Sequence, residues 1–145
     1  AAALVIDGAE LRVVRELAAV ARDPIIEKWA AYRVGEGMAR VAERALKLRL
    51  SRAMLSSYFF CDELLTPKAQ EFLFDFTPGA AAAMYPAGVT AENVRERLLQ
   101  VTGESTGNPF SAGRVLHYLE LFADQITQLR LALYAATGRI RKEAA

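Results

Sequence analysis

The chain has 145 residues, of which 53% are hydrophobic and 24% are charged, which is the balance of one globular domain and not of a disordered segment. Its net charge of +1 argues against a dedicated nucleic-acid binder, and its single cysteine, Cys61, excludes an internal disulfide. The sequence contains no uncharged apolar run of about 18 residues, which argues against a transmembrane span.

The spacing of apolar residues predicts an all-α fold. Two long segments carry apolar residues at intervals of three, four or seven, as a helix with one buried face does. Alternating patterns bounded by hairpin turns, which would indicate a sheet, are absent from the sequence. We therefore expect residues 1–145 to form a single-domain antiparallel helical bundle with two long helices, at about 24–63 and 109–137, and three shorter ones.

The first predicted helix follows an N-terminal arm, residues 1–6. Asp7 and Glu10 have the spacing of a capping box, with the aspartate accepting from free backbone N–H groups. We expect this helix to end near Arg22. Its inner face is marked by Leu11, Val14, Leu17 and Ala18.

The second helix is predicted to begin at Asp23-Pro24, because aspartate can cap a helix and proline suits its first position. Gly35 and Gly37 indicate a kink or close packing in its early part, and a break near Ser56-Ser57 is an alternative to one continuous helix. Its apolar stripe comprises Val34, Val41, Leu48 and Leu55, spaced seven apart, with Met38, Ala45 and Phe59 between them.

Shorter elements occupy the middle of the sequence. Thr66-Pro67 opens a short helix that carries several phenylalanines, and Ala80 to Met84 suits one helical turn or an ordered loop. Thr90 is predicted to begin a further helix. The inward residues of that helix are Val94, Leu98 and Val101.

The last long helix is predicted to begin at Asn108-Pro109 or at Ser111 and to end at Gly138, which leaves residues 139–145 as a basic tail. Its apolar residues recur at steps of 4, 3, 4, 3 and 4. A stripe of this kind must be buried against another element, in the same chain or in another one. We call these six residues the C-terminal stripe: Val115, Leu119, Phe122, Ile126, Leu129 and Leu133.

Two groups of residues are candidates for binding a partner. Phe74 and Phe76 lie in an aromatic-rich region that either fills the core or forms an exposed patch. Four cations lie near one another on the second helix and either dock an anionic partner surface or form a solvated face with scattered ion pairs. We call these four the basic strip: Arg33, Arg40, Arg44 and Lys47.

No residues qualify as catalytic, cofactor-binding or metal-binding candidates. His117, Glu120 and Asp124 can share a helix face, but the chain has one histidine and no Glu-x-x-His motif, so we interpret them as a polar outer face. Cys61 lies in an apolar run far from His117 in the sequence, which favours a buried thiol over a nucleophile.

The sequence therefore favours a non-catalytic interaction protein: an accessory subunit of a larger assembly that binds other protein subunits, in a hetero-complex or a homo-oligomer. The alternative is a helical bundle that binds a small apolar ligand or pigment, for which Ala80 to Tyr85 could line a pocket. The first residues, Ala1-Ala2-Ala3, fit either a processed organellar protein of the chloroplast or mitochondrion, or a trimmed chain of cytoplasmic origin.

Overall fold

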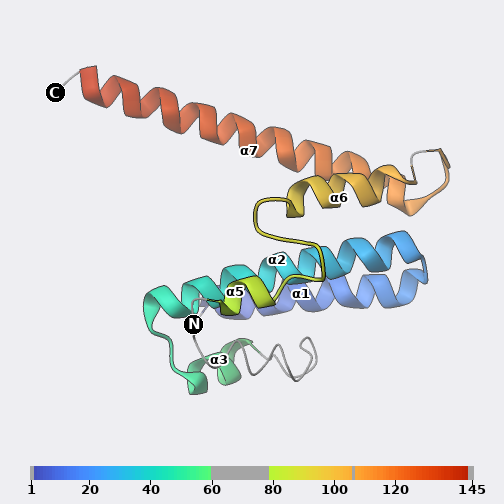
Figure 1. Ribbon diagram of the computed structural model, residues 1–145, viewed down its shortest axis with the longest axis horizontal. Coiled ribbons are helices and arrows are strands. Elements are labelled where there is room, and N and C mark those ends of the chain that lie inside the picture. Colours follow the sequence, from blue (N-terminus) through green and yellow to red (C-terminus); the bar gives the residue numbers. More distant parts are fainter. Residues whose placement is uncertain (1, 60–78, 106, 144–145) are drawn as a thin grey trace.

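The computed structural model describes residues 2–59, 79–105 and 107–143, and in this part of the chain all regular structure is helical. The all-α prediction is therefore confirmed. The described helices, labelled as in Figure 1, are α1 (Ala2–Ala21), α2 (Pro24–Leu48), α3 (Arg52–Phe59), α5 (Ala80–Ala83), α6 (Val94–Gly103) and α7 (Ala112–Glu143).

The helices are arranged as two hairpins that lie against each other. Figure 1 shows α1 and α2 side by side as one antiparallel pair, and α6 with the first part of α7 as the second. Helix α6 packs on α2 and joins the two pairs, while α5 lies along α2 and α3 contacts α1. The C-terminal half of α7 extends past the end of α6 and away from the other helices (Figure 1).

Helix α1 begins earlier than predicted, so the expected arm at residues 1–6 is wrong for its described part. The helix starts at Ala2, and Leu4 is only 3% exposed. Leu4 lies seven residues, or two turns, before Leu11 and therefore faces the same way into the core. Asp7 lies inside the helix, where its carboxylate pairs with Arg44 of α2 and does not act as a cap.

The start of α2 is as predicted. Asp23 is the N-cap, and its Oδ1 accepts a hydrogen bond of 2.8 Å from the backbone N–H of Ile25. Pro24 occupies the first helical position, where its missing N–H leaves no donor unpaired.

The predicted long helix at 24–63 is wrong, because α2 ends at Leu48 and α3 begins at Arg52. Arg49 adopts the left-handed conformation, with φ 50° and ψ 45°, and the N–H of Leu50 donates to the carbonyl of Ala45 at 3.0 Å. This is a Schellman ending, which glycine usually provides. Ser51 then caps α3 by accepting from the N–H of Met54 at 3.2 Å.

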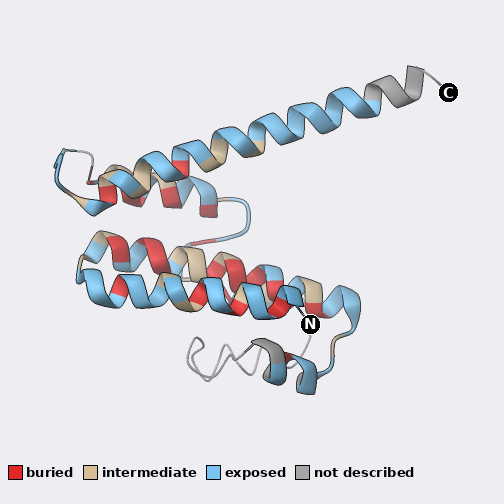
Figure 2. Cartoon of the chain, turned by 180° about the vertical axis from the view of Figure 1, so that it is seen from behind, coloured by how far each residue is buried: buried red, intermediate tan, exposed pale blue. Residues whose placement is uncertain are grey.

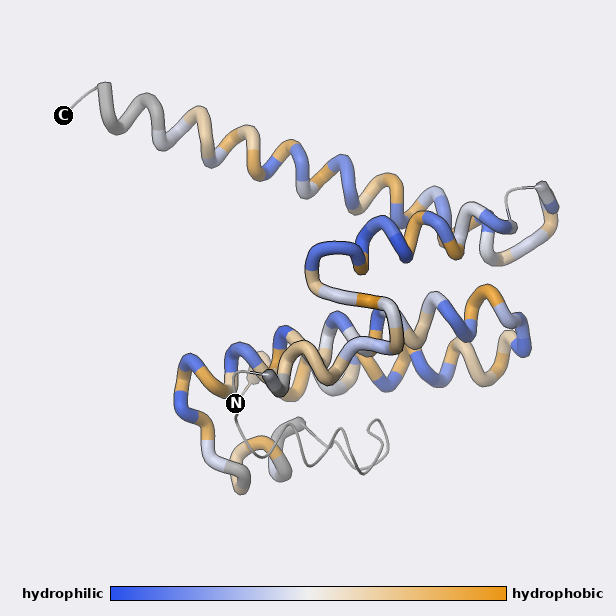
Figure 3. The backbone as a smooth tube through the Cα atoms, in the orientation of Figure 1, coloured by the Kyte–Doolittle hydropathy of each residue, from blue (hydrophilic) through white to orange (hydrophobic). Residues whose placement is uncertain are grey.

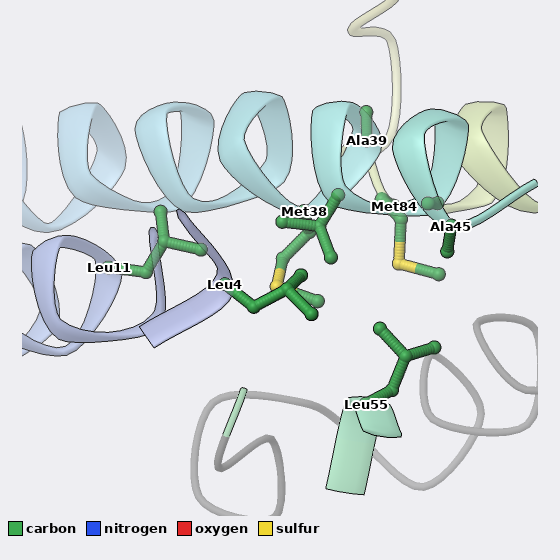
Figure 4. Packing of buried hydrophobic residues seen from close by; sticks show 9 residues of the cluster. Leu4, Leu11, Met38, Ala39, Ala45, Leu55 and Met84 are labelled. Carbon is green, nitrogen blue, oxygen red and sulfur yellow. The ribbon is translucent and has the colours of Figure 1, made fainter. Parts of the chain in front are cut away.

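One core cluster lies between α1, α2, α3 and α5. Figure 4 shows Leu4 and Leu11 of α1 facing Met38 of α2, with Leu55 of α3 and Met84 closing the cluster. Most described members of the α2 stripe are thus buried as predicted. Val34 is only half-buried, and Leu48 is 63% exposed, because the chain turns away at Arg49 before Leu48 can be covered.

A second core cluster lies at the other end of α2 and joins it to α6. Val94, Leu98 and Val101 are buried there, which confirms the predicted inner face of that helix. They pack with Ala18 of α1 and with Trp29 of α2. Figure 2 shows that the buried residues concentrate in α1, α2 and α6, whereas α7 is exposed along most of its length.

Both predicted ends of the last helix can be compared with α7. The Ser111 alternative for its start is confirmed, since the Ser111 hydroxyl accepts from the N–H of Gly113 at 3.1 Å and the helix begins at Ala112. The predicted end at Gly138 is wrong. The helix continues to Glu143, so residues 139–143 belong to α7 and are not a separate tail.

Gly35 marks a close approach between α2 and the segment after α5. A Cβ at this position would lie 2.9 Å from Cδ of Pro86 and 3.0 Å from the backbone oxygen of Met84. The second contact is to backbone, which cannot move aside without shifting the core cluster that holds Met84.

We therefore expect Gly35→Ala to lower the free energy of unfolding by about 1–2 kcal/mol, because overpacking outweighs the higher helix propensity of alanine. Gly138→Ala is the matched control, since that helical glycine has nothing within 4 Å. Its stability should be unchanged or higher by up to about 1 kcal/mol. Urea titration of both variants measures the difference, and a Gly35 variant as stable as the wild type would contradict the close packing.

Candidate interaction surface

The C-terminal stripe is exposed among the residues that the structure describes, so of the two alternatives that the sequence left open, burial against another element of the same chain is not observed. Its six side chains leave between 36% and 65% of their surface accessible. In Figure 3 the apolar segments recur along α7 well beyond the end of α6. The helical period was therefore correct, but within the chain the stripe is not buried.

The opposite face of α7 holds the helix to the rest of the fold. At about 100° per residue, Glu120 and Asp124 lie roughly opposite Phe122 and Ile126 around the helix axis. Glu120 contacts α2, and Asp124 contacts α6. The stripe therefore points away from α2 and α6.

The strongest polar contact on this inner face centres on Glu120, whose side chain is only 8% exposed. Its Oε1 accepts hydrogen bonds from the indole Nε1 of Trp29 at 2.7 Å and from Nε of Arg33 at 2.9 Å. Nη2 of Arg33 donates to the other carboxylate oxygen. The guanidinium of Arg33 thus makes a bidentate ion pair with the carboxylate of Glu120, a geometry in which two parallel hydrogen bonds make the pair strong and directional.

Arg33 has a second acidic partner, Glu36, which accepts from its Nη1 at 2.8 Å. Burial alone lowers the pKa of Arg33. Its hydrogen bonds to Glu120 and the charges of Glu120 and Glu36 outweigh that effect, so the net pKa lies above the usual value. Spacings of three or four residues place Trp29, Arg33 and Glu36 on one face of α2. No pattern in the sequence predicts that this face contacts Glu120.

The interpretation of His117, Glu120 and Asp124 as a polar outer face is wrong, because all three face other helices. Nδ1 of His117 lies 3.0 Å from the hydroxyl of Thr102 in α6. The hydroxyl of Thr102 also contacts the carbonyl of Leu98 at 2.8 Å, and the tautomer of the imidazole sets which of Thr102 and His117 donates in their contact. Asp124 accepts from Nη1 of Arg95 in α6 at 2.7 Å.

Three members of the basic strip line one groove, while the fourth, Arg33, shares a different groove with Arg40. Arg40, Arg44 and Lys47 line one shallow surface groove of about 420 Å³ together with Glu43 and Leu48. Arg44 is also paired with Asp7 of α1. Arg33 lies outside this groove and holds α7 through Glu120, so it has a structural role that the sequence did not indicate.

A second, apolar groove of about 600 Å³ runs between α1 and α2 and is open to solvent. Arg33 and Arg40 form its α2 side. The region that was expected to line a ligand pocket, Ala80 to Tyr85, contributes Met84 to the core instead. The α1 side of the groove is formed by Ile6, Ala9, Glu10, Leu11, Val13 and Val14.

The remaining predicted binding residues, Phe74 and Phe76, lie outside the residues that the structure describes, as does Cys61. Across residues 2–59, 79–105 and 107–143, no three histidine, cysteine, aspartate or glutamate side chains gather as metal ligands would. None of the helices described is both long and apolar enough to cross a membrane.

The stripe is flanked by a shallow apolar groove of about 600 Å³ near the start of α7. Val115, Leu119 and Phe122 of the stripe line it, together with Tyr118, Leu121 and Gln125. This groove gives a partner side chain a recess beside the stripe. The C-terminal stripe with this groove is our candidate interaction surface.

Comparisons of the chain with protein-family models, curated proteins and solved structures find no match.

The contact of Glu120 with α2 generates a stability prediction. Glu120→Ala leaves the Arg33 guanidinium and the Trp29 indole N–H without their shared acceptor, so we expect the free energy of unfolding to fall by about 2–4 kcal/mol. Asp124→Ala removes a more exposed ion pair of the same helix and should cost less than about 1 kcal/mol. Urea titration compares them, and equal losses would mean that the Glu120 contact does not hold α7.

Proposed function

We propose that this chain is a non-catalytic interaction protein that acts as an accessory subunit of a larger protein assembly and docks through the C-terminal stripe of α7. The observation that carries the proposal is the exposure of six large apolar side chains in line on one helix. A domain with two packed core clusters has no need to leave such residues in water for its own folding.

The size of the exposed face supports a protein partner. Six large side chains, each about one third to two thirds exposed, present roughly 600 Å² of apolar surface. Contiguous apolar patches of this extent on soluble domains usually mark a binding surface, because exposing apolar surface to water is unfavourable in free energy.

The pattern of the stripe indicates which kind of element covers it. Steps of alternating three and four residues average 3.5 residues per turn, which keeps a stripe facing a partner helix along its length. A partner helix can insert side chains between those of the stripe at a shallow crossing angle. We therefore expect the partner to present an apolar helix face.

The inner face of α7 supports a fixed presentation of the stripe. Glu120, His117 and Asp124 tie the first half of the helix to α2 and α6. These contacts fix the rotation of the helix about its own axis, so a partner meets a preorganised surface and binding loses less conformational entropy. The basic groove at Arg40, Arg44 and Lys47 would add contacts with an acidic part of the same assembly.

Site-specific photocrosslinking in cells that make the full chain tests this proposal. A benzophenone side chain in place of Leu129 should crosslink to protein, whereas the same group at Gln128, exposed but off the stripe, should not. Leu119→Glu should abolish the adduct by placing a charge in the contact. Leu131→Glu should preserve it, because Leu131 is 58% exposed against 57% for Leu119 but lies about 120° away around the helix.

Absence of any protein adduct from the stripe positions, or equal adducts from Leu129 and Gln128, would contradict the proposal. Mass spectrometry of the adduct distinguishes a different protein from a second copy of this chain.

The apolar groove between α1 and α2 favours a second candidate function, the binding of a small apolar ligand. Its α1 side is largely aliphatic, and Arg40 could pair with an acidic headgroup. A fluorescent fatty acid should then bind in the micromolar range, at least about tenfold more weakly to Val13→Glu. Val20→Glu, an exposed α1 residue outside the groove, is the control and should bind normally. Equal binding by both variants would exclude this groove.

A further inference from the structure

The spacing of the C-terminal stripe is the same in both directions along the helix. Steps of 4, 3, 4, 3 and 4 reverse into themselves. A second copy of α7 laid antiparallel against the first therefore brings the same six residues into contact around a two-fold axis near residue 124. Across that axis the pairs are Val115 with Leu133, Leu119 with Leu129, and Phe122 with Ile126.

These pairs are well matched in size. In heptad terms Leu119, Ile126 and Leu133 occupy a positions, while the other three occupy d positions, and antiparallel helices pair a with d. Each layer then joins one smaller and one larger or two equal side chains. A parallel pair would instead set Phe122 against Phe122 and Val115 against Val115, which makes one crowded layer and one loose layer.

The charges of α7 also favour the antiparallel arrangement. The e and g positions of the heptad flank the stripe. Those between Leu116 and Gln125 are uncharged, and Arg130 is the first charged residue at such a position. Antiparallel helices place the two copies of Arg130 about 18 Å apart along the axis, twelve residues at 1.5 Å each, whereas parallel helices bring them to one level. A parallel pair would also bring together both basic ends, which contain Arg139, Arg141 and Lys142.

The fold leaves room for a second copy on this face. Helices α2 and α6 pack on the side of α7 that carries Glu120 and Asp124. They therefore lie behind α7 as seen from the stripe. Figure 2 shows no other described helix beside the C-terminal half of α7, which extends alone. A second copy can approach along the stripe without meeting the first copy's α1–α2 pair.

The area is of the order that a dimer needs. The stripe offers roughly 600 Å² of apolar surface, and Tyr118 and Leu121 beside it add to this. Stable interfaces bury about 800 Å² on each partner. We propose that the C-terminal stripe is the interface of a two-fold antiparallel dimer of this chain. This inference rests on the proposed function, since it names the partner that docks on the same face.

Sedimentation equilibrium of the full chain tests the dimer. The wild type should be dimeric at micromolar concentration, and Leu119→Glu should raise the dimer Kd at least about 100-fold, because it buries two charges per dimer. Leu131→Glu should leave the Kd within about threefold. Circular dichroism and thermal unfolding of both variants establish that the fold is retained. A monomeric wild type at 100 µM, or equal effects of the two variants, would overturn the proposal.

Disulfide crosslinking tests the orientation, in a chain whose Cys61 is first replaced by serine and which sediments as the wild type does. Leu119→Cys and Leu129→Cys are placed on separate chains, one carrying a size tag. Mixed under mild oxidation, they should link to each other and not to themselves. Self-linked products of each variant would show a parallel pair and overturn the antiparallel arrangement. Gln128→Cys, off the stripe, should remain unlinked.

The outcomes separate this inference from the proposed function. A monomeric chain whose position 129 crosslinks to a different protein in cells would overturn the dimer but support the interaction protein. A monomer with no adduct at position 129 would overturn both.

Discussion

The carboxylate of Glu120 determines which face of α7 is exposed to solvent. It lies where α7 meets α2 and accepts hydrogen bonds from Trp29 and Arg33. A buried carboxylate is stable only when cations and donors surround it, so this side of α7 must face α2. A helix cannot turn one face inward without turning the opposite face outward. The contact therefore fixes the C-terminal stripe on the outside, with consequences for every proposal about function.

The same contact explains how α7, a long helix with an apolar stripe, is held in the fold although that stripe is not buried in either core cluster. Within the described residues, the two core clusters are built from α1, α2, α3, α6 and the segment around α5, and Leu116 is the apolar α7 side chain that packs against them. The helix is held instead by polar and charged side chains along its first half. Its apolar residues are thereby available for another helix, and their self-complementary spacing makes a second copy of this chain a fitting occupant.

The contrast between the two predicted stripes shows how far periodicity reaches. Met38, Val41 and Ala45 of α2 are buried as expected, whereas Phe122 and Leu129 of α7 are exposed by more than half of their surface. Both segments have helical spacing, since periodicity depends only on which residues share a face. Whether another element covers that face depends on contacts between distant residues, such as Glu120 with Arg33, which are 87 positions apart. The aromatic residues Phe74 and Phe76 stay untested predictions, because they lie outside the described residues.

The sequence by itself determined the helical class, the cap at Asp23 and the inner face of α6, and it narrowed the start of α7 to Asn108-Pro109 or Ser111, because each depends on residues within a few positions of one another. Only the tertiary structure decided that α1 begins at Ala2, that Arg49 ends α2 and that His117, Glu120 and Asp124 face inward. Leu4 needs a core to bury it, and Arg49 takes a conformation that its residue type disfavours. A carboxylate is buried only where a cation such as Arg33 lies close to it in space. Because the two residues are far apart in the sequence, no local sequence pattern predicts their contact.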